Sequence, residues 1–89
     1  MQTEPFTLKT GKTWLQGVHH LPEKYPAPYV ISAHGMLSTK DSPKYTALGT
    51  NLVENGFGFV RFDFTGCGES SGDFADSPLP RRIEDLIKM

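Results

Sequence analysis

The sequence has only one cysteine, Cys67, among its 89 residues. A single cysteine cannot form an internal disulfide, and it cannot supply the pair of thiols in a Cys-x-x-Cys metal or redox site. A chain that does without disulfides is typical of a reducing compartment, so we expect a cytoplasmic protein.

The sequence also lacks an excess of charge of either sign. It has 9 lysines and arginines against 10 aspartates and glutamates, and Arg81-Arg82 is the only adjacent basic pair. Nucleic-acid-binding domains usually carry a clustered basic surface. No apolar run approaches the ~20 residues of a membrane helix. The N-terminal residues also lack the charged and apolar regions of a signal peptide. We therefore expect neither a nucleic-acid partner nor membrane attachment.

The first part of the chain reads as a β-hairpin. Residues 6–10 (FTLKT) and 13–21 (TWLQGVHHL) alternate in polarity, and Gly11-Lys12 between them suits a tight turn. Three prolines then lie between Pro22 and Pro28, which excludes a helix or a central strand there.

Two later segments are short, nearly continuous apolar runs: 29–33 (YVISA) and 57–64 (FGFVRFDF). Such runs are typical of strands buried on both faces of a parallel sheet. Between them, residues 43–55 have the apolar spacing of a helix. Ser42 suits its N-cap, and Gly56 suits the left-handed position after its end.

A second helix is predicted over residues 79–89 (LPRRIEDLIKM), with its apolar face formed by Ile83, Leu86 and Ile87. The order strand, strand, strand, helix, strand, helix predicts an α/β fold, in which an antiparallel hairpin leads into a parallel βαβ unit. A doubly wound sheet is expected to continue with another strand within a few residues, and none follows Met89. We therefore expect residues 1–89 to be the N-terminal portion of a single larger domain.

The stretch VRFDFTGCGESSGDF, residues 60–74, places Gly66, Gly68 and Gly72 close together. Their spacing is G-x-G-x-x-x-G, which differs from the dinucleotide fingerprint, and the next helix begins several residues later. No Walker-type Gly-Lys-Ser/Thr follows. We interpret the stretch as a tight scaffold turn, with Asp63 and Ser70 hydrogen-bonded to its backbone amides.

Two other candidate sites are weaker. Cys67 could act as a nucleophile only with a general base in reach, and the sequence places no histidine beside it. His19 and His20 are neighbours on a strand and point to opposite faces, so they make a poor metal site, and we expect a solvated strand end there. We expect no metal and no cofactor.

The stretch SAHGMLS is more informative. A buried strand ends at His34-Gly35, at the sheet edge where open α/β sheets place their sites. Gly35 has no Cβ, so the backbone can turn there and present its amides. An acyl-transfer enzyme needs such N–H donors for a developing oxyanion. A simple strand-to-loop turn would have the same local sequence.

Taken together, the strand ending in HG, the helix, NGFGFVRFDFTGCGES, SGDF and RRIEDL resemble the α/β-hydrolase superfamily. The similarity is greatest to its small serine esterases, the cinnamoyl/feruloyl-esterase-like branch, and runs from about Phe6 to the end of the chain. The sequence departs from the usual RFDxRGxGxS pattern at Thr65 and Cys67. It matches the pattern at Arg61, Phe62, Asp63, Gly66, Gly68 and Ser70.

This resemblance implies a role for each matching residue. The backbone N–H of Met36 would be one donor of an oxyanion hole, and His34 and Gly35 would shape its loop. Structural roles in the turn would fall to Asp63, Gly66, Gly68 and Ser70. The resemblance implies a small-molecule ester substrate and Ser-His-Asp acyl transfer without a cofactor.

The nucleophile motif of that superfamily, G-x-S-x-G, is absent. The stretch GESSG, residues 68–72, comes closest and centres on Ser70, but no helix follows it directly. We expect all three triad residues beyond Met89. The 89 residues alone are then inactive, and the whole protein is an esterase, with thioesterase and peptidase activity left open. The alternative is a non-enzymatic structural or interaction module that self-associates through the exposed edge of strand 29–33.

Overall fold

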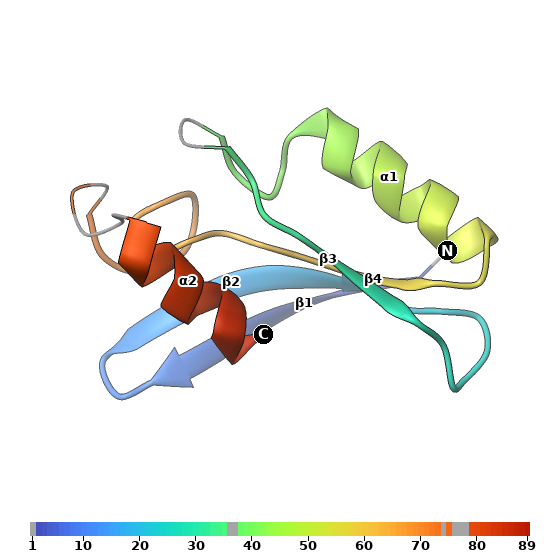
Figure 1. Ribbon diagram of the computed structural model, residues 1–89, viewed down its shortest axis with the longest axis horizontal. Coiled ribbons are helices and arrows are strands. Elements are labelled where there is room, and N and C mark those ends of the chain that lie inside the picture. Colours follow the sequence, from blue (N-terminus) through green and yellow to red (C-terminus); the bar gives the residue numbers. More distant parts are fainter. Residues whose placement is uncertain (1, 36–37, 74, 76–78) are drawn as a thin grey trace.

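The computed structural model describes residues 2–35, 38–73, 75 and 79–89 (Figure 1). The predicted order of elements is confirmed. In chain order they are β1 (Thr3–Thr10), β2 (Thr13–His20), β3 (Tyr29–Ser32), α1 (Pro43–Glu54), β4 (Gly58–Phe62) and α2 (Leu79–Lys88).

The four strands form one mixed sheet in the order β1-β2-β4-β3. The hairpin strands β1 and β2 are antiparallel, with Thr10 opposite Thr13 at the turn. Strand β4 is antiparallel to β2 and parallel to β3, and α1 joins β3 to β4. The predicted α/β class, with a hairpin leading into a parallel βαβ unit, is therefore confirmed.

The two helices lie on opposite sides of this sheet (Figure 1). On one side α1 packs closely because Gly49 has no side chain: a Cβ there would lie 2.6 Å from the His20 ring and 2.9 Å from Phe59. On the other side Phe62, Phe64 and Cys67 form a buried cluster against which Met89, after α2, packs. The alternation of β4 side chains between these two faces builds both halves of the core.

The apolar sequence of β3 predicted a strand buried on both faces, and this prediction is wrong for the described residues. Among the described residues it has a neighbouring strand on only one side, and the side chains of Tyr29 and Ile31 are 41% and 42% exposed. The apolar face predicted for α2 is also largely uncovered, since Ile83 is 51% and Ile87 is 78% exposed. The strand and the helix are where the sequence predicted them, but within the described residues their burial is incomplete.

The helix ends differ in one detail from the prediction. Ser42 occupies the N-cap position of α1, but its side chain makes no capping hydrogen bond. Gly56 has a φ of 89°, the left-handed conformation expected after the helix. Neither described helix has the length and hydrophobicity needed to cross a bilayer.

Candidate functional site

The site predicted around His34 and Gly35 lies where β3 ends, beside the end of β4. His34 is 4% exposed, and its Nε2 accepts a hydrogen bond of 3.1 Å from the backbone N–H of Phe64. Because Nε2 is an acceptor, the proton of a neutral ring is on Nδ1, which lies 2.7 Å from the Gly35 carbonyl oxygen and donates to it. The Ser38 N–H donates to the same oxygen over 3.2 Å. The Gly35 carbonyl is thus held by two donors.

A cavity of about 270 Å³ opens beside His34. Its wall is mostly apolar and comes from the two residues after β3, the second residue after β4 and one face of α2. The lining residues are Ala33, His34, Phe64, Leu79, Arg82, Ile83 and Leu86. The third residue of the predicted oxyanion loop, Met36, lies outside the described residues.

A buried ionic cluster anchors the chain a few residues further on. Lys40 is 2% exposed, and its Nζ lies 2.9 Å from Asp63 Oδ2, 2.9 Å from Asp41 Oδ2 and 2.6 Å from Glu69 Oε1. Asp63 is fully buried, and its Oδ1 accepts the backbone N–H of Lys40 over 2.8 Å. The cluster therefore links the segment after β3 to the turn after β4.

Arg61 extends this cluster along β4. Its Nη1 donates to the Lys40 carbonyl over 2.9 Å and to Asp41 Oδ1 over 3.0 Å. Its Nε donates to His20 Nε2 over 2.9 Å. The two cations, Lys40 and Arg61, are thus matched by hydrogen-bonded carboxylates and a neutral histidine, as buried charges require.

The cluster shifts the pKa values of its members. Burial alone would lower the pKa of Lys40, but hydrogen bonds from its ammonium group to Glu69, Asp63 and Asp41 raise it above the usual value. Burial likewise pushes the pKa of Asp41 upward, but the hydrogen bond and charge of Lys40, followed by those of Arg61, outweigh this and lower it. Lys40 therefore stays cationic and Asp41 anionic at neutral pH.

Three carboxylates of this cluster could in principle hold a metal ion. One oxygen from each of Asp41, Asp63 and Glu69 lies within 4.8 Å of the others. However, the Lys40 ammonium makes a hydrogen bond to each of the three. The donor set does not fit a metal, because the chain supplies its own cation at that point.

The glycine turn is built as a scaffold around Asp63. The Glu69 N–H donates to Asp63 Oδ2 over 3.0 Å, as predicted for that carboxylate. Ser70 differs from the prediction: its Oγ donates to the Asp63 carbonyl over 2.6 Å and accepts the Gln16 N–H of β2 over 2.9 Å. Gly66 and Gly68 have φ of 76° and 50°, so both sit in the left-handed region.

The same contacts test the possibility that Ser70, within GESSG, is a nucleophile. Its hydroxyl is bonded to two backbone groups, and the residue is only 8% exposed. A nucleophilic serine needs a general base in hydrogen-bond reach. Ser70 therefore has the contacts of a structural residue.

The expectation of a solvated strand end at His19-His20 is wrong for His20. Its side chain is fully buried against α1 and Phe59, with ring centroids 5.4 Å apart. His19 points the other way and lies 2.7 Å from the Tyr29 hydroxyl. The two rings do face opposite sides of the sheet, as predicted, so they do not form a joint metal site.

We expect the protein to lose stability as the pH falls below neutral because of His20. Burial, followed by the charge of Arg61, lowers the pKa of His20 below its ordinary value of 6.5. The unfolded chain then binds a proton that the folded chain does not, so this contribution is intact above pH 6.5 and is lost as the pH drops toward the folded pKa. The slope is at most about 1.4 kcal/mol per pH unit.

Urea unfolding between pH 7.5 and 5 measures this slope, and His20→Gln is the matched variant. The substitution should flatten the pH dependence even if it lowers stability at every pH. An equally steep slope in His20→Gln would assign the effect to another group.

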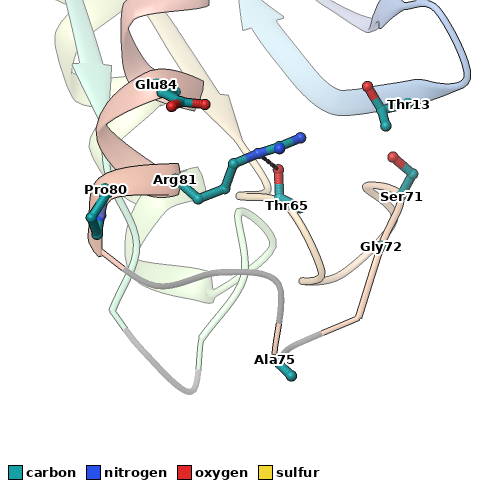
Figure 2. A pocket seen from close by; sticks show the side chains of 8 residues that line it. All are labelled: Thr13, Thr65, Ser71, Gly72, Ala75, Pro80, Arg81 and Glu84. Atoms are coloured by element: carbon teal, nitrogen blue, oxygen red, sulfur yellow. Dashed lines mark hydrogen bonds between the residues drawn. The ribbon is translucent and has the colours of Figure 1, made fainter.

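A larger pocket of about 570 Å³ lies elsewhere, between the hairpin turn, the glycine turn and α2 (Figure 2). None of the predicted site residues that the structure describes lines it, so we assign the candidate site to the smaller cavity beside His34. Its lining residues are Thr13, Thr65, Ser71, Gly72, Ala75, Pro80, Arg81 and Glu84.

Thr65, one of the two departures from the superfamily pattern, lines this larger pocket. Thr65 stands where arginine is common, and its N–H donates to the fully buried Asp85 over 2.8 Å. A guanidinium group reaches this contact from α2, where Arg81 Nε lies 3.5 Å from Asp85 Oδ1 and donates to Thr65 Oγ1 over 3.2 Å. Figure 2 draws the hydrogen bond from Arg81 to Thr65. The positive charge of Arg81 therefore lies beside the negative charge of the buried Asp85 carboxylate.

Sequence reasoning missed Lys40, Asp41 and Glu69 as parts of one cluster. A signal was present, because Arg61 and Asp63 are charged residues inside an otherwise apolar strand segment, and buried charges require partners. The sequence does not identify those partners, since Lys40 is 23 residues from Asp63 and 29 from Glu69.

Comparisons with known proteins give a consistent assignment at the level of structure. No family model matches the sequence, and no curated protein does. Est1E from Butyrivibrio proteoclasticus, solved with bound ferulic acid, is 24% identical with a TM-score of 0.84, over 93% of this chain and 34% of that one.

Two further solved structures are similar over 98% of this chain. A candidate hydrolase from Agrobacterium vitis S4 is 25% identical with a TM-score of 0.82, and the match covers 34% of its chain. An α/β serine hydrolase homologue from Coxiella burnetii is 26% identical with a TM-score of 0.72, and the match covers 43% of its chain.

The matches thus cover 34% to 43% of the length of these three chains. Its mixed sheet and two flanking helices correspond to the part of the fold that comes first in the sequence. The chain therefore has the fold of the N-terminal part of an α/β-hydrolase domain, and the predicted resemblance to the α/β-hydrolase superfamily is confirmed.

Proposed function

We propose that this chain is the N-terminal part of a serine carboxylic-ester hydrolase that works by Ser-His-Asp acyl transfer. In this proposal the triad residues lie beyond Met89, so the 89 residues alone are inactive. The substrate is a small-molecule ester, and thioesterase or peptidase activity is the nearest variant of the same chemistry. No cofactor is needed for this reaction. The lone free thiol, Cys67, is buried and suits a cytoplasmic setting.

The observation that carries the proposal is the way the Gly35 carbonyl is held. His34 Nδ1 and the Ser38 N–H both donate to this oxygen. A peptide group is planar, so contacts that fix its carbonyl also restrict its N–H on the opposite side. In the peptide group that begins at Gly35, that N–H belongs to Met36, the donor we propose for the oxyanion hole. A preorganised donor of this kind favours the charge that develops in acyl transfer.

Replacing Gly35 by valine in the whole natural protein tests this role. A Cβ at Gly35 meets no atom within 4 Å, so the substitution should leave the stability of the fold nearly unchanged. The branched side chain would stand beside the proposed oxyanion donor. We expect turnover of short-chain aryl esters to fall by about a hundredfold or more, the usual effect of losing one oxyanion-hole donor.

Gly35→Ala is the graded control and should have the smaller effect. Thermal unfolding of both variants separates loss of fold from loss of the site. Normal turnover in a folded Gly35→Val enzyme would refute the oxyanion assignment. The intact mass of the protein from its natural source tests the broader proposal, which requires a mass well above 9.9 kDa.

An alternative function is a non-enzymatic module in which two copies of the chain associate through β3. The observation in its favour is that β3 is an edge strand with Tyr29 and Ile31 exposed, and an unpaired strand edge is a template for another strand. Sedimentation of the 89-residue chain should then show a dimer that is weakened by Ile31→Lys. A monomer at high concentration would argue against it.

A further inference from the structure

Every polar group of Lys40 is bonded to β4, to the turn that follows it or to Asp41. Its backbone N–H donates to Asp63 Oδ1, its carbonyl accepts from Arg61 Nη1, and its ammonium reaches Asp63, Asp41 and Glu69. A lysine side chain normally keeps its ammonium in water. Here the residue is 2% exposed, and burial of an ammonium group is costly unless the group is paired and hydrogen-bonded, as it is in this cluster.

The position of Lys40 bears on the turn at Gly35. The described segment after β3 is tied at two places to β4 and to the two residues that follow β4. The first is His34, through the Phe64 N–H, and the second is Lys40, through Arg61 and Asp63. Ser38, two residues before Lys40, donates to the Gly35 carbonyl. The Lys40 cluster therefore holds the segment that contains Ser38, whose N–H is one of the two donors to the Gly35 carbonyl.

We propose that Lys40 is a positioning residue for the proposed hydrolytic site. Its ammonium group fixes the segment Ser38–Ser42 against the carboxyl end of β4, and through Ser38 it fixes the peptide group of Gly35. Lys40 touches no substrate. It acts through the backbone. The expected effect of Lys40 on catalysis rests on the proposed function, whereas its anchoring of residues 38–42 does not.

The structural consequence is tested first, by hydrogen exchange of the whole natural protein with Lys40 replaced by methionine. Methionine has a similar length but carries no charge. We expect exchange of the amides of residues 38–42 to rise about tenfold or more while exchange in the β1–β2 hairpin stays unchanged, since a lost anchor opens its own segment. Lys44→Met is the matched control because Lys44 is exposed on α1, and it should change neither region.

The catalytic consequence is tested with Lys40→Ala and added n-propylammonium chloride. This ion has the three carbons and the ammonium group that the alanine variant lacks beyond Cβ. We expect kcat for aryl esters to fall by about tenfold to a hundredfold in the variant, because small misplacement of a catalytic group costs that much. KM should change less than threefold, and propylammonium, but not propanol, should restore much of kcat.

These outcomes separate the two proposals. Unchanged exchange at residues 38–42 in Lys40→Met would overturn the positioning role, as would a rise spread evenly over the whole chain. Local exchange with no effect on kcat, or no rescue by propylammonium, would overturn its catalytic part. If the wild-type protein hydrolyses no ester, the proposed function fails, and the exchange result still decides whether Lys40 anchors the segment.

Discussion

Replacing Asp63 by asparagine is expected to lower the free energy of unfolding by about 3–5 kcal/mol, the usual cost of removing one partner of a buried ion pair. Asp63 is fully buried and accepts three hydrogen bonds through its carboxylate: the N–H and Nζ of Lys40 and the N–H of Glu69. Asparagine has almost the same shape, so the change removes charge and acceptor capacity and leaves no cavity.

The geometry makes the loss unavoidable in either orientation of the new amide. Asp63 Oδ2 accepts two donors, and Oδ1 accepts the third. An asparagine NH₂ group at either place would face at least one N–H or the ammonium and could not accept from it. Lys40, itself 2% exposed, would keep only two of its three carboxylate partners, Asp41 and Glu69, whose side chains are 57% and 68% exposed.

Urea unfolding of the wild type and the variant measures this effect, and Glu23→Gln is the control for an exposed carboxylate in a loop. The control should change stability by less than about 0.5 kcal/mol. The double variant Lys40→Met/Asp63→Asn should lose less than the sum of the two single changes, because the two groups interact directly. A loss below 1 kcal/mol for Asp63→Asn would show that the cluster does not stabilise the fold.

The second large loss of folding stability is expected for the substitution Gly68→Ala. Gly68 has a φ of 50°, and a Cβ at that position would overlap the carboxylate of Asp63. The left-handed conformation costs a non-glycine residue about 1–2 kcal/mol. Pushing a buried group aside costs about 1–3 kcal/mol more. We therefore expect the free energy of unfolding to fall by roughly 2–5 kcal/mol in total, with Asp63 displaced from Lys40.

Gly56→Ala is the matched control for the conformational part alone. Gly56 has a φ of 89°, and a Cβ there meets no atom within 4 Å. It should lose only about 1–2 kcal/mol. The difference between the two variants in urea unfolding isolates the overlap with Asp63. Equal losses would mean that the turn moves away from Asp63 without cost.

The local patterns of the sequence predicted the elements well. The alternating segments 6–10 and 13–21 correspond to β1 and β2, and the apolar run before His34 contains β3. The helix predicted over 43–55 is α1, which ends at Glu54 with Gly56 in the left-handed conformation. These features depend on neighbours a few residues apart, which is the range over which side-chain periodicity and turn residues act.

Burial was predicted less well, because it depends on what lies beside each element. His20 is buried because Gly49, on a helix that begins 23 positions later in the chain, leaves room for its ring. Tyr29 and Ile31 of β3 are exposed because β4 is its only described neighbour.

The sequence by itself determined the order of strands and helices, the glycine turn and the strand end at His34-Gly35, since each is encoded by residues that are adjacent or nearly so. Only the tertiary structure decided that Lys40 is the cation of a buried cluster and that Ser70 is bonded to two backbone groups. It also decided that His34 accepts from Phe64. These contacts join residues that are distant in the sequence, and the folding of β3 and β4 into one sheet brings them together.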